Sequence, residues 1–458
     1  MFSVRAYMLD ISRDKVPTMG TLKLLVDLLA RFDYNQFQLY TEHTFAYQNH
    51  KEVWQNASPM TPAEIRELDA YCAMRGIELV PNQNTFGHLE RWLVKPAYNA
   101  LAELPKGGAP LPWGGFKKDP TTLCPTNPAS LAFVEGLLDE LLPHFTSRLV
   151  NIGCDETFDL CGRGRSAAAV AEKGEGRVYL DFLLRVAEAA RARGRRVQFW
   201  GDVILRHPEL VGELPKDMIA LNWGYEGNHP FQTEAAQFKK AGLAFYVCPG
   251  TSAWNSLAGR VENMRENMMA AEQAGRQFGA QGFMVTDWGD GGHWQPLAAS
   301  LPGLVLGGNL AFAGPSAAKM NLEEALDSVM GVPLGGTLLR LGTLYLRGGA
   351  LRANASELFR ILANDHTYSR HSGLTDSVLT EISSIAEGCR HAASRYVGGI
   401  YPNIWAQEIV HMANLVDAAC HRRDPKRLRF LRDEHDRVWA LRNRPGGMVD
   451  SREKLPRF

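Results

Sequence analysis

The chain has 458 residues, of which 45% are hydrophobic and 22% are charged, a composition typical of a globular protein with one large domain and a smaller one. Fifty basic and fifty acidic residues give a formal net charge of zero, so the charge balance predicts neither nucleic acid nor an anionic membrane as a partner. No apolar run reaches the roughly 20 residues of a membrane-spanning helix, and the start MFSVRAYMLD lacks secretory-signal features. We therefore expect a cytoplasmic protein.

Seven cysteines are scattered along the chain without CxxC or Cys/His ligand spacing. An odd number of unclustered cysteines indicates free thiols in a reducing compartment rather than a disulfide framework or a zinc site. We expect no metal and no cofactor.

In chain order, strand-like apolar runs bounded by turn residues recur eight times: SVRAYMLD, QFQLYTEH, IELVPNQN, RLVNIGCD, RRVQFWGD, MIALNWGY, AFYVCPGT and GFMVTDWGD. Helix-period segments such as MGTLKLLVDLLARF and VYLDFLLRVAEAARAR lie between most of them. This alternation predicts an α/β fold, a (β/α)8 barrel over residues 1–315. A doubly wound open sheet is the second choice, because no Gly-rich phosphate motif follows the first strand.

Residues 91–128 form a long insertion rich in Pro, Gly and Lys after the third strand, which we expect in the wall of a site. Asn127 and Pro128 announce the next helix as N-cap and first helical residue. Residues 316–458 show only amphipathic helix patterns, which predicts a helical C-terminal domain. Near its end, Arg442 and Arg444 indicate either a solvated helix end or a contact with the barrel or with a second copy in a homodimer.

In a (β/α)8 barrel, functional side chains lie at the carboxyl ends of the strands. The predicted strand ends carry many polar and aromatic residues: Arg5, Asp10, Glu42, His43, Asn82, Asn84, His88, Asp155, Glu156, Trp200, Asp202, Trp223, Tyr225, Trp254, Asn255, Asp287, Trp288 and Asp290. Four tryptophans together favour a sugar site, because pyranose faces stack on aromatic rings while carboxylates, amides and Arg bind the hydroxyls.

The adjacent acids Asp155 and Glu156 follow the small residues Gly153 and Cys154, which leave room inside the barrel mouth. The motif VNIGCDET, which contains this pair, resembles the Asp-Glu motif of glycoside hydrolase family 20, the β-N-acetylhexosaminidases. VRAYMLDISRDKVPT, ELVPNQNTFGH and MVTDWGD are similar to further strands of that family, over roughly residues 1–310. The likeness is greatest to its hexosaminidase D-like branch.

The resemblance implies an exo-acting, retaining enzyme in which the acetamido carbonyl of the substrate is the nucleophile and forms an oxazoline. Glu156 would then be the general acid and base, a role that calls for a raised pKa. Asp155 would hold the acetamido N–H and stabilise the developing positive charge. The substrate would be a terminal β-linked N-acetylglucosamine or N-acetylgalactosamine.

The resemblance also implies roles for the surrounding residues. Arg5 matches the arginine that binds O3 and O4, and His88 the histidine beside the catalytic pair. Either Asn82 or Asn84 replaces an aspartate, and Asp290 replaces a glutamate that reads O4 and O6, which leaves the preferred epimer open. Trp200, Trp223 and Trp288 match the aromatic box around the acetamido methyl. The oxazoline-supporting tyrosine has no clean match, and the candidates to replace it are Tyr225, Trp254 and Asn255.

Two other functions stay open at this stage. A barrel that binds a sugar without hydrolysing it would explain the missing tyrosine, although it has no use for Glu156. A metal-dependent hydrolase would use His43, His88, Asp155 and Asp202, but no HxH or HxxxH spacing occurs at a strand end.

Overall fold

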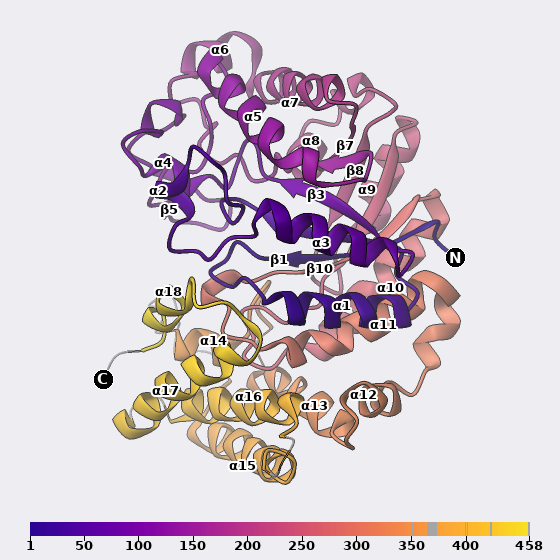
Figure 1. Cartoon of the computed structure of the whole chain (residues 1–458), viewed down its shortest axis with the longest axis vertical. Helices are drawn as coiled ribbons and strands as arrows, with labels where there is room; N and C mark the ends of the chain where they lie inside the picture. Colours follow the sequence, from indigo (N-terminus) through magenta and orange to yellow (C-terminus); the bar gives the residue numbers. More distant parts are fainter. Residues whose placement is uncertain (350, 364–372, 399, 401, 422–423, 457–458) are drawn as a thin grey trace.

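The computed structural model describes residues 1–349, 351–363, 373–398, 400, 402–421 and 424–456. Parallel strands close into a barrel in the order β1, β10, β9, β8, β7, β6, β3, β2, surrounded by helices (Figure 1). The barrel strands are β1 (Val4–Asp10), β2 (Gln36–Thr41), β3 (Glu78–Gln83), β6 (Leu149–Asn151), β7 (Arg196–Trp200), β8 (Ile219–Trp223), β9 (Ala244–Cys248) and β10 (Gly282–Asp287). The predicted (β/α)8 barrel is therefore confirmed.

The barrel region also contains the helices α1 (Met19–Arg31), α2 (Lys51–Trp54), α3 (Pro62–Ala73), α4 (Glu90–Leu93), α5 (Pro128–Leu141), α6 (Ala167–Lys173), α7 (Glu175–Ala192), α8 (Asp202–Leu205), α9 (Phe231–Lys240), α10 (Val261–Phe278) and α11 (Leu301–Ala313). Local sequence sets several of their starts. The Asn127 side chain accepts a hydrogen bond from the Ala129 N–H before α5, as predicted, and Thr61 and Glu64 form a capping box at α3.

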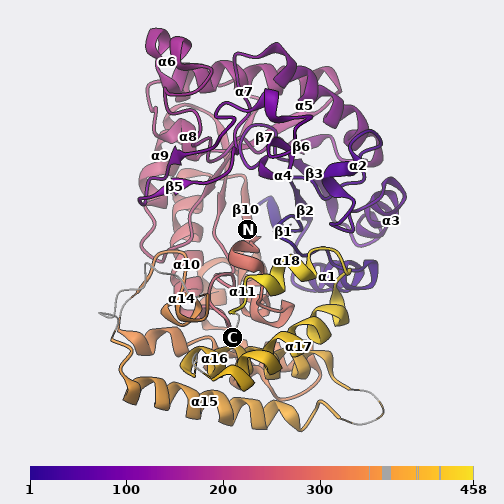
Figure 2. The same cartoon turned by 90° about the vertical axis from the view of Figure 1, so that its left-hand side faces the viewer.

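The insertion after β3 contains α4 and a small antiparallel hairpin of β4 (Ala109–Pro110) and β5 (Phe116–Lys117). Because the barrel strands are parallel, all their carboxyl ends meet at one end of the barrel. Figure 2 looks onto this end and shows β5 beside the mouth of the barrel.

Two apolar cores are present. The inner one fills the barrel and consists of Ala6, Met8, Tyr40, Trp200, Ile219, Leu221, Tyr246, Cys248, Trp254, Met284 and Trp288. A buried amide layer lies in the same interior, where Gln38 donates to Gln198 at 2.8 Å and accepts from Asn82 at 3.0 Å. The outer core lies between strands and helices and continues into the C-terminal helices.

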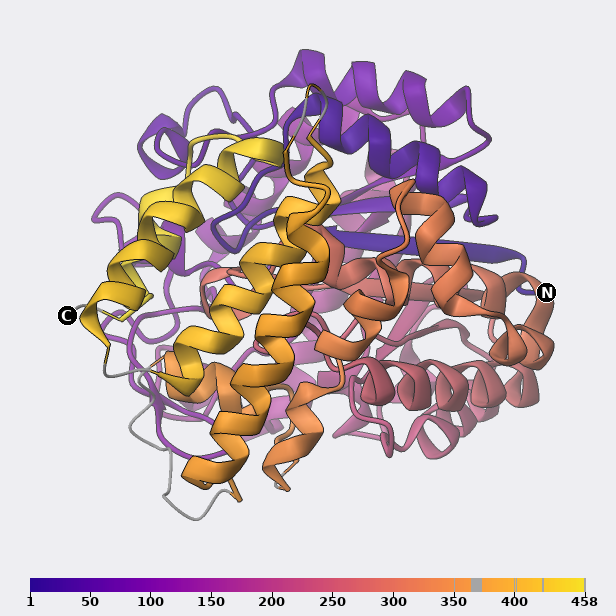
Figure 3. The same ribbon diagram turned by 90° about the horizontal axis from the view of Figure 1, so that it is seen from below.

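The C-terminal helices are α12 (Leu322–Met330), α13 (Gly335–Leu341), α14 (Glu357–Leu362), α15 (Asp376–Ser394), α16 (Ile404–Cys420), α17 (Pro425–Arg442) and α18 (Met448–Glu453). Figure 3 shows these orange and yellow helices packed as a layer against one side of the barrel. The predicted helical C-terminal region is confirmed. Its predicted boundary at residue 315 falls inside the short 3-10 helix Gly314–Lys319 and stays a prediction.

Among the described residues, the continuous helical stretch Leu297–Lys319 is long and apolar enough to cross a membrane, and a bent helix pair over residues 322–348 passes the same test. The expectation that no run reaches this length is therefore wrong. In the first stretch 78% of the apolar window is buried, because α11 packs on β1 and β10 as the last helix of the barrel.

Of the two arginines near the chain end, Arg442 joins α17 to α16 and Arg444 holds the chain end on the barrel. Arg442 is buried, donates to Glu408 at 2.6 Å and lies 3.9 Å from the Trp405 ring centroid. Arg444 donates to the carbonyls of Pro17 and Pro59 in the barrel at 3.1 and 2.9 Å. The contact with the barrel is confirmed and the solvated helix end is wrong. Because both side chains are used within the chain, they no longer argue for a homodimer.

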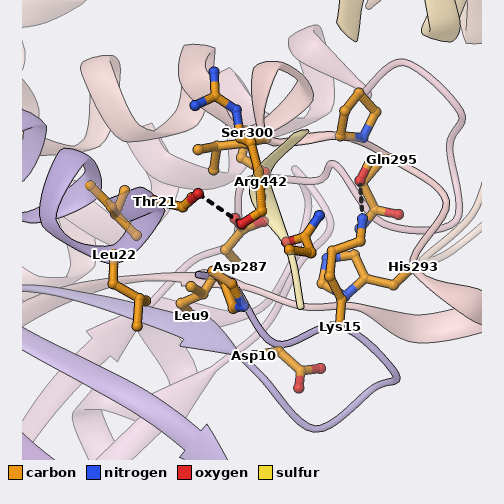
Figure 4. A pocket seen from close by; sticks show the side chains of 15 residues that line it. Leu9, Asp10, Lys15, Thr21, Leu22, Asp287, His293, Gln295, Ser300 and Arg442 are labelled. Atoms are coloured by element: carbon orange, nitrogen blue, oxygen red, sulfur yellow. Dashed lines mark hydrogen bonds between the residues drawn. The ribbon is translucent and has the colours of Figure 1, made fainter. Parts of the chain in front are cut away.

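A cavity of about 30 Å³ lies at this junction, between α1, β1, β10 and the end of α17 (Figure 4). It has room for about two water molecules, since one needs about 10–15 Å³, and is too small for a sugar. Lys15 at its edge donates to the Gln295 carbonyl at 2.8 Å, and burial lowers the pKa of the Lys15 ammonium to about 7. The cavity is part of the barrel–helix junction.

Candidate active site

The acidic pair lies on a sharply bent turn after β6. Gly153, Cys154 and Glu156 all have left-handed backbone, with φ of 70°, 71° and 47°. A Cβ on residue 153 would lie under 3.0 Å from the Asn84 side chain, so only glycine fits there. Non-glycine residues in this region cost free energy and cluster at functional sites. The strained turn aims Asp155 and Glu156 into the mouth of the barrel.

Asp155 is buried and held from two sides. Asn84 donates to its Oδ1 at 2.9 Å, and His88 Nε2 lies 3.1 Å from its Oδ2. Burial by itself would raise the pKa of the Asp155 carboxyl, but the His88 charge and the contacts with His88 and Asn84 outweigh it and lower this pKa. Asp155 is therefore an ionised, fixed carboxylate.

His88 joins the two acids. Its Nε2 also lies 3.3 Å from Glu156 Oε2, and its backbone N–H donates to Thr121 of the insertion at 3.1 Å. Burial opposes the imidazolium, but Asp155 and Glu156 together raise the pKa of His88 well above its usual value. The loop that carries His88 can approach the acids closely because residue 87 is glycine. A Cβ at this position would clash with the Asp155 carbonyl.

Glu156 differs from Asp155 in access to solvent. Its side chain is 25% exposed, against 7% for Asp155. The Glu156 N–H donates to Asp202 Oδ2 at 3.2 Å, and Trp223 donates to Oδ1 of the same residue at 3.4 Å. Burial, followed by the charges of Asp155 and Glu156, raises the pKa of Asp202 to about 7. The two acids thus have different environments, which suits two different tasks.

Arg5 does not belong to this site. It lies near the start of β1, beside Phe283 near the start of β10, and donates to the backbone carbonyls of Phe2 and Asp33. These contacts are at the amino end of the barrel, opposite the acids. The prediction that Arg5 binds the substrate is therefore wrong, because a strand residue five positions before the carboxyl end cannot reach the mouth.

Arg13 supplies the guanidinium of the site. It follows β1 and lies 3.2 Å from Asp10, 3.4 Å from Glu42 and 3.8 Å from Asp290. Its NH2 atom lies 3.3 Å from His88 Nδ1. The same group lies over two rings, 4.7 Å from the centroid of Tyr40 and 4.9 Å from that of Trp288, a cation–π arrangement.

Tyr40 and Glu42 connect this arginine to the acids. The Tyr40 hydroxyl donates to Glu42 at 2.9 Å and accepts from Asn84 at 3.1 Å. Burial raises the pKa of Glu42 to about 7, although Arg13 and His88 oppose it. Burial likewise raises the pKa of Asp290, against the charge of Arg13. The mouth therefore holds a continuous polar network around Arg13.

The predicted aromatic residues form one wall of the site. Trp200 and Trp288 lie 5.9 Å apart between ring centroids, and Trp288 donates to the Tyr225 hydroxyl at 2.7 Å. Tyr225 stacks on Trp223 at 5.1 Å and meets Trp254 edge-on at 5.0 Å. Trp200 and Trp254 belong to the buried inner core, so they support the wall from behind.

Most of the predicted residues converge at the mouth: Asn84, His88, Asp155, Glu156, Trp200, Trp223, Tyr225, Trp254, Trp288 and Asp290. Asn255 instead donates to the Asn354 backbone carbonyl. Asn82 points into the amide layer, so Asn84 is the amide that contacts the acidic pair. Sequence reasoning gave no role to Arg13 or Tyr40. The position of Arg13, three residues past Asp10, was the available signal.

Among the residues that the structure describes, no group of three or more His, Cys, Asp or Glu side chains is placed to hold a metal ion. His43, His88, Asp155 and Asp202 therefore do not form the ligand set that the metal-dependent alternative requires. The His43 ring is buried, and its pKa is lowered to about 3 by burial and then by Arg91.

A closed barrel that holds a carboxylate pair, a guanidinium and an aromatic wall at its carboxyl end has the architecture of the barrel glycoside hydrolases. Residues 2–301 match the family model described as glycosyl hydrolase family 20, catalytic domain. The chain therefore belongs to glycosyl hydrolase family 20, and the predicted resemblance is confirmed.

Similar proteins agree with this assignment. Hexosaminidase D of Homo sapiens is 24% identical over 320 residues, covering 66% of this chain and 63% of the human protein. The Bos taurus hexosaminidase D is 24% identical over 280 residues, covering 57% and 77%. The chain thus spans less than two thirds of the human protein that it matches.

Solved structures show the same fold. The Flavobacterium johnsoniae chitobiase superposes with a TM-score of 0.57 and 17% identity over 99% of this chain and 78% of its own. The β-N-acetylhexosaminidase of Bacteroides fragilis gives 0.55 and 19%, over 72% and 70%. At these identities the likeness concerns the fold.

Proposed function

We propose that the protein is an exo-acting, retaining β-N-acetylhexosaminidase that releases terminal β-linked N-acetylglucosamine or N-acetylgalactosamine with participation of the substrate's acetamido group. The unequal environments of Asp155 and Glu156 carry this proposal. Hexosaminidase D, the name of the human and bovine relatives, supports the class of activity. Two carboxylates with the same task would not need such different surroundings.

In this proposal Glu156 is the general acid and then the general base. Its partial exposure at the mouth lets it reach both the glycosidic oxygen and an incoming water. His88 Nε2, 3.3 Å away, orients the carboxyl and balances its charge once the proton has left. The Arg13 and Glu42 groups on the other side of the His88 ring keep that ring in place.

Asp155 holds the acetamido N–H and stabilises the positive charge that develops as the acetamido oxygen attacks C1. This role needs a carboxylate that stays ionised, and the lowered pKa of Asp155 supports it. Trp223 and Trp288, which Trp200 supports from behind, receive the acetamido methyl and the ring face. The Tyr225 hydroxyl, which already accepts from Trp288, takes the place of the missing tyrosine as the oxazoline partner.

Arg13 and Asp290 form hydrogen bonds with the O3, O4 and O6 hydroxyls of the terminal sugar. A guanidinium donates to two oxygens in one plane, and Asp290 is the most exposed carboxylate around it, with a side chain 33% exposed. Since O4 distinguishes the two epimers, this pair sets the preference between the gluco and galacto sugars. The seven unpaired cysteines support a reducing, cytoplasmic location.

The test is p-nitrophenol release from the β-N-acetylglucosaminide, the β-N-acetylgalactosaminide and the β-glucoside. We expect cleavage of acetamido sugars only, unaffected by EDTA. Glu156→Gln should reduce kcat at least about 100-fold, the usual contribution of a general acid or base. NMR of the first product should show the β anomer. Release of the α anomer first would refute retention, and cleavage of the β-glucoside at the same rate would refute acetamido participation.

Comparison of the variant with the wild-type protein separates hydrolysis from mere binding. If the wild-type protein binds an acetamido sugar but cleaves none, the sugar-binding alternative is correct. Loss of activity with EDTA would favour the metal-dependent alternative, and full activity of Glu156→Gln would remove Glu156 from the mechanism.

A further inference from the structure

The hairpin β4–β5 carries two of the most exposed aromatic side chains of the described chain. Trp113 in its turn is 69% exposed and Phe116 is 68% exposed. Single exposed apolar residues are common, but neighbouring exposed aromatic rings beside a functional site mark a binding surface.

The hairpin is tied to the catalytic loop. The Trp113 ring meets the Phe158 ring edge-on, with centroids 5.5 Å apart and planes at 88°. The Phe158 N–H in turn donates to the Glu156 carbonyl at 2.7 Å. Phe158 therefore connects Trp113 directly to the turn that carries the proposed general acid.

A second tie fixes the other strand of the hairpin. Lys117 of β5 pairs with Glu90, two residues after His88. Glu90 is ionised, since Lys117 and His88 lower its pKa against the effect of burial. Arg163 also donates to the Gly108 carbonyl at 3.4 Å, which links the hairpin to the chain beyond Phe158. The hairpin is thus held at both arms beside the mouth (Figure 2).

We propose that Trp113 and Phe158 form the subsite for the leaving group, and that its occupant is the pyranose ring to which the terminal acetamido sugar is linked. This inference rests on the proposed function. The edge-to-face contact with Phe158 leaves Trp113 69% exposed. Sugar rings pack their apolar faces on exposed aromatic rings of this kind. The leaving group departs from the side of Glu156, which protonates it, and Phe158 lies on that side.

The alternative occupant is an apolar aglycone, such as an aryl group or a lipid. The charged groups that fix the hairpin favour the sugar, because Lys117, Glu90 and Arg163 can also bind hydroxyls. A purely apolar ligand would make no use of these groups.

The experiment compares two substrates with the same terminal sugar, the epimer that the wild-type protein prefers. One is a β-linked disaccharide and the other is the methyl β-glycoside, which lacks the second ring. Trp113→Ala should lower kcat/KM for the disaccharide relative to the methyl glycoside about 2- to 10-fold, the usual effect of one stacked ring. Trp113→Phe should restore most of the ratio, and Phe430→Ala, an exposed ring on α17, should leave it unchanged.

An equal loss for both substrates, or none, would overturn the subsite. Calorimetric binding to Glu156→Gln keeps this result separate from the proposed function. In that background, Trp113→Ala should weaken binding of the disaccharide and leave that of the methyl glycoside unchanged, whether or not the wild-type protein hydrolyses either. If the variant loses affinity only for p-nitrophenyl glycosides, the occupant is an apolar aglycone and the sugar assignment is wrong.

Discussion

Replacing Arg13 with glutamine tests which arginine serves the site, because Arg5 offers a matched control at the opposite end of the same strand. Arg13 lies among Asp10, Glu42 and Asp290. The Arg5 side chain instead donates to two backbone carbonyls at the amino end and lies over the Phe312 ring. We expect Arg13→Gln to reduce kcat/KM strongly and Arg5→Gln to leave it nearly unchanged.

The size of the effect follows from the contacts. A hydrogen bond from a charged donor is worth about 1.5–3 kcal/mol, so each one that Arg13 makes to the sugar in the transition state contributes about 10- to 150-fold to kcat/KM. Loss of the guanidinium also leaves Glu42 and Asp10 without their cation. The stability cost stays below the roughly 3–5 kcal/mol of a fully buried pair, because the Arg13 side chain is 21% exposed.

The assay is steady-state hydrolysis of the preferred p-nitrophenyl sugar by both variants, with urea unfolding to confirm that each is folded. Arg13→Lys, which keeps the charge but loses the planar fork, should lie between Arg13→Gln and the wild-type protein. The reasoning fails if Arg13→Gln retains kcat/KM within about threefold, or if Arg5→Gln loses as much activity as Arg13→Gln.

Three further predictions concern stability and the catalytic turn. The pKa of Asp202 is raised to about 7, so its contribution to stability is present below its ordinary pKa of 3.8 and is lost as the pH rises through 7. Asp202→Asn should therefore lessen the fall in the free energy of unfolding, measured with urea, between pH values of about 5 and 8. An unchanged dependence of this free energy on pH would contradict the prediction. Arg442→Met removes the guanidinium beside buried Glu408, which keeps the hydrogen bond from the Ala298 N–H, and should cost about 3–5 kcal/mol in the same assay. Adding Glu408→Gln should recover part of this loss, and a loss under about 1 kcal/mol would show that the pair is not a stabilising contact. Gly153→Ala should abolish activity, because φ at this residue is 70° and the new Cβ would clash with Asn84. The control Gly136→Ala inside α5, with open space around it, should keep full activity and raise the free energy of unfolding by up to about 1 kcal/mol. An active Gly153→Ala enzyme would mean that the turn adapts.

The sequence by itself determined the barrel and the position of the acidic pair. Strand and helix periodicity is a local property, so eight apolar runs separated by helical segments predict the alternation without any contact being known. The Asp155–Glu156 pair was equally visible, because it directly follows a strand and the carboxyl ends of parallel strands share one end of the barrel. The start of α5 was likewise encoded locally, by Asn127 as N-cap and Pro128 as the first helical residue.

The tertiary structure alone decided which arginine enters the site and what the chain end does. Strand residues advance about 3.3 Å each, so Arg5 lies roughly 16 Å before Asp10 along β1, while Arg13 lies beyond it at the mouth. The sequence does not show where a strand opens into the mouth. Arg442 looked like a surface charge because its partners, Glu408 and Trp405, lie on another helix. Contacts between distant segments depend on packing of the whole chain, which no local pattern encodes.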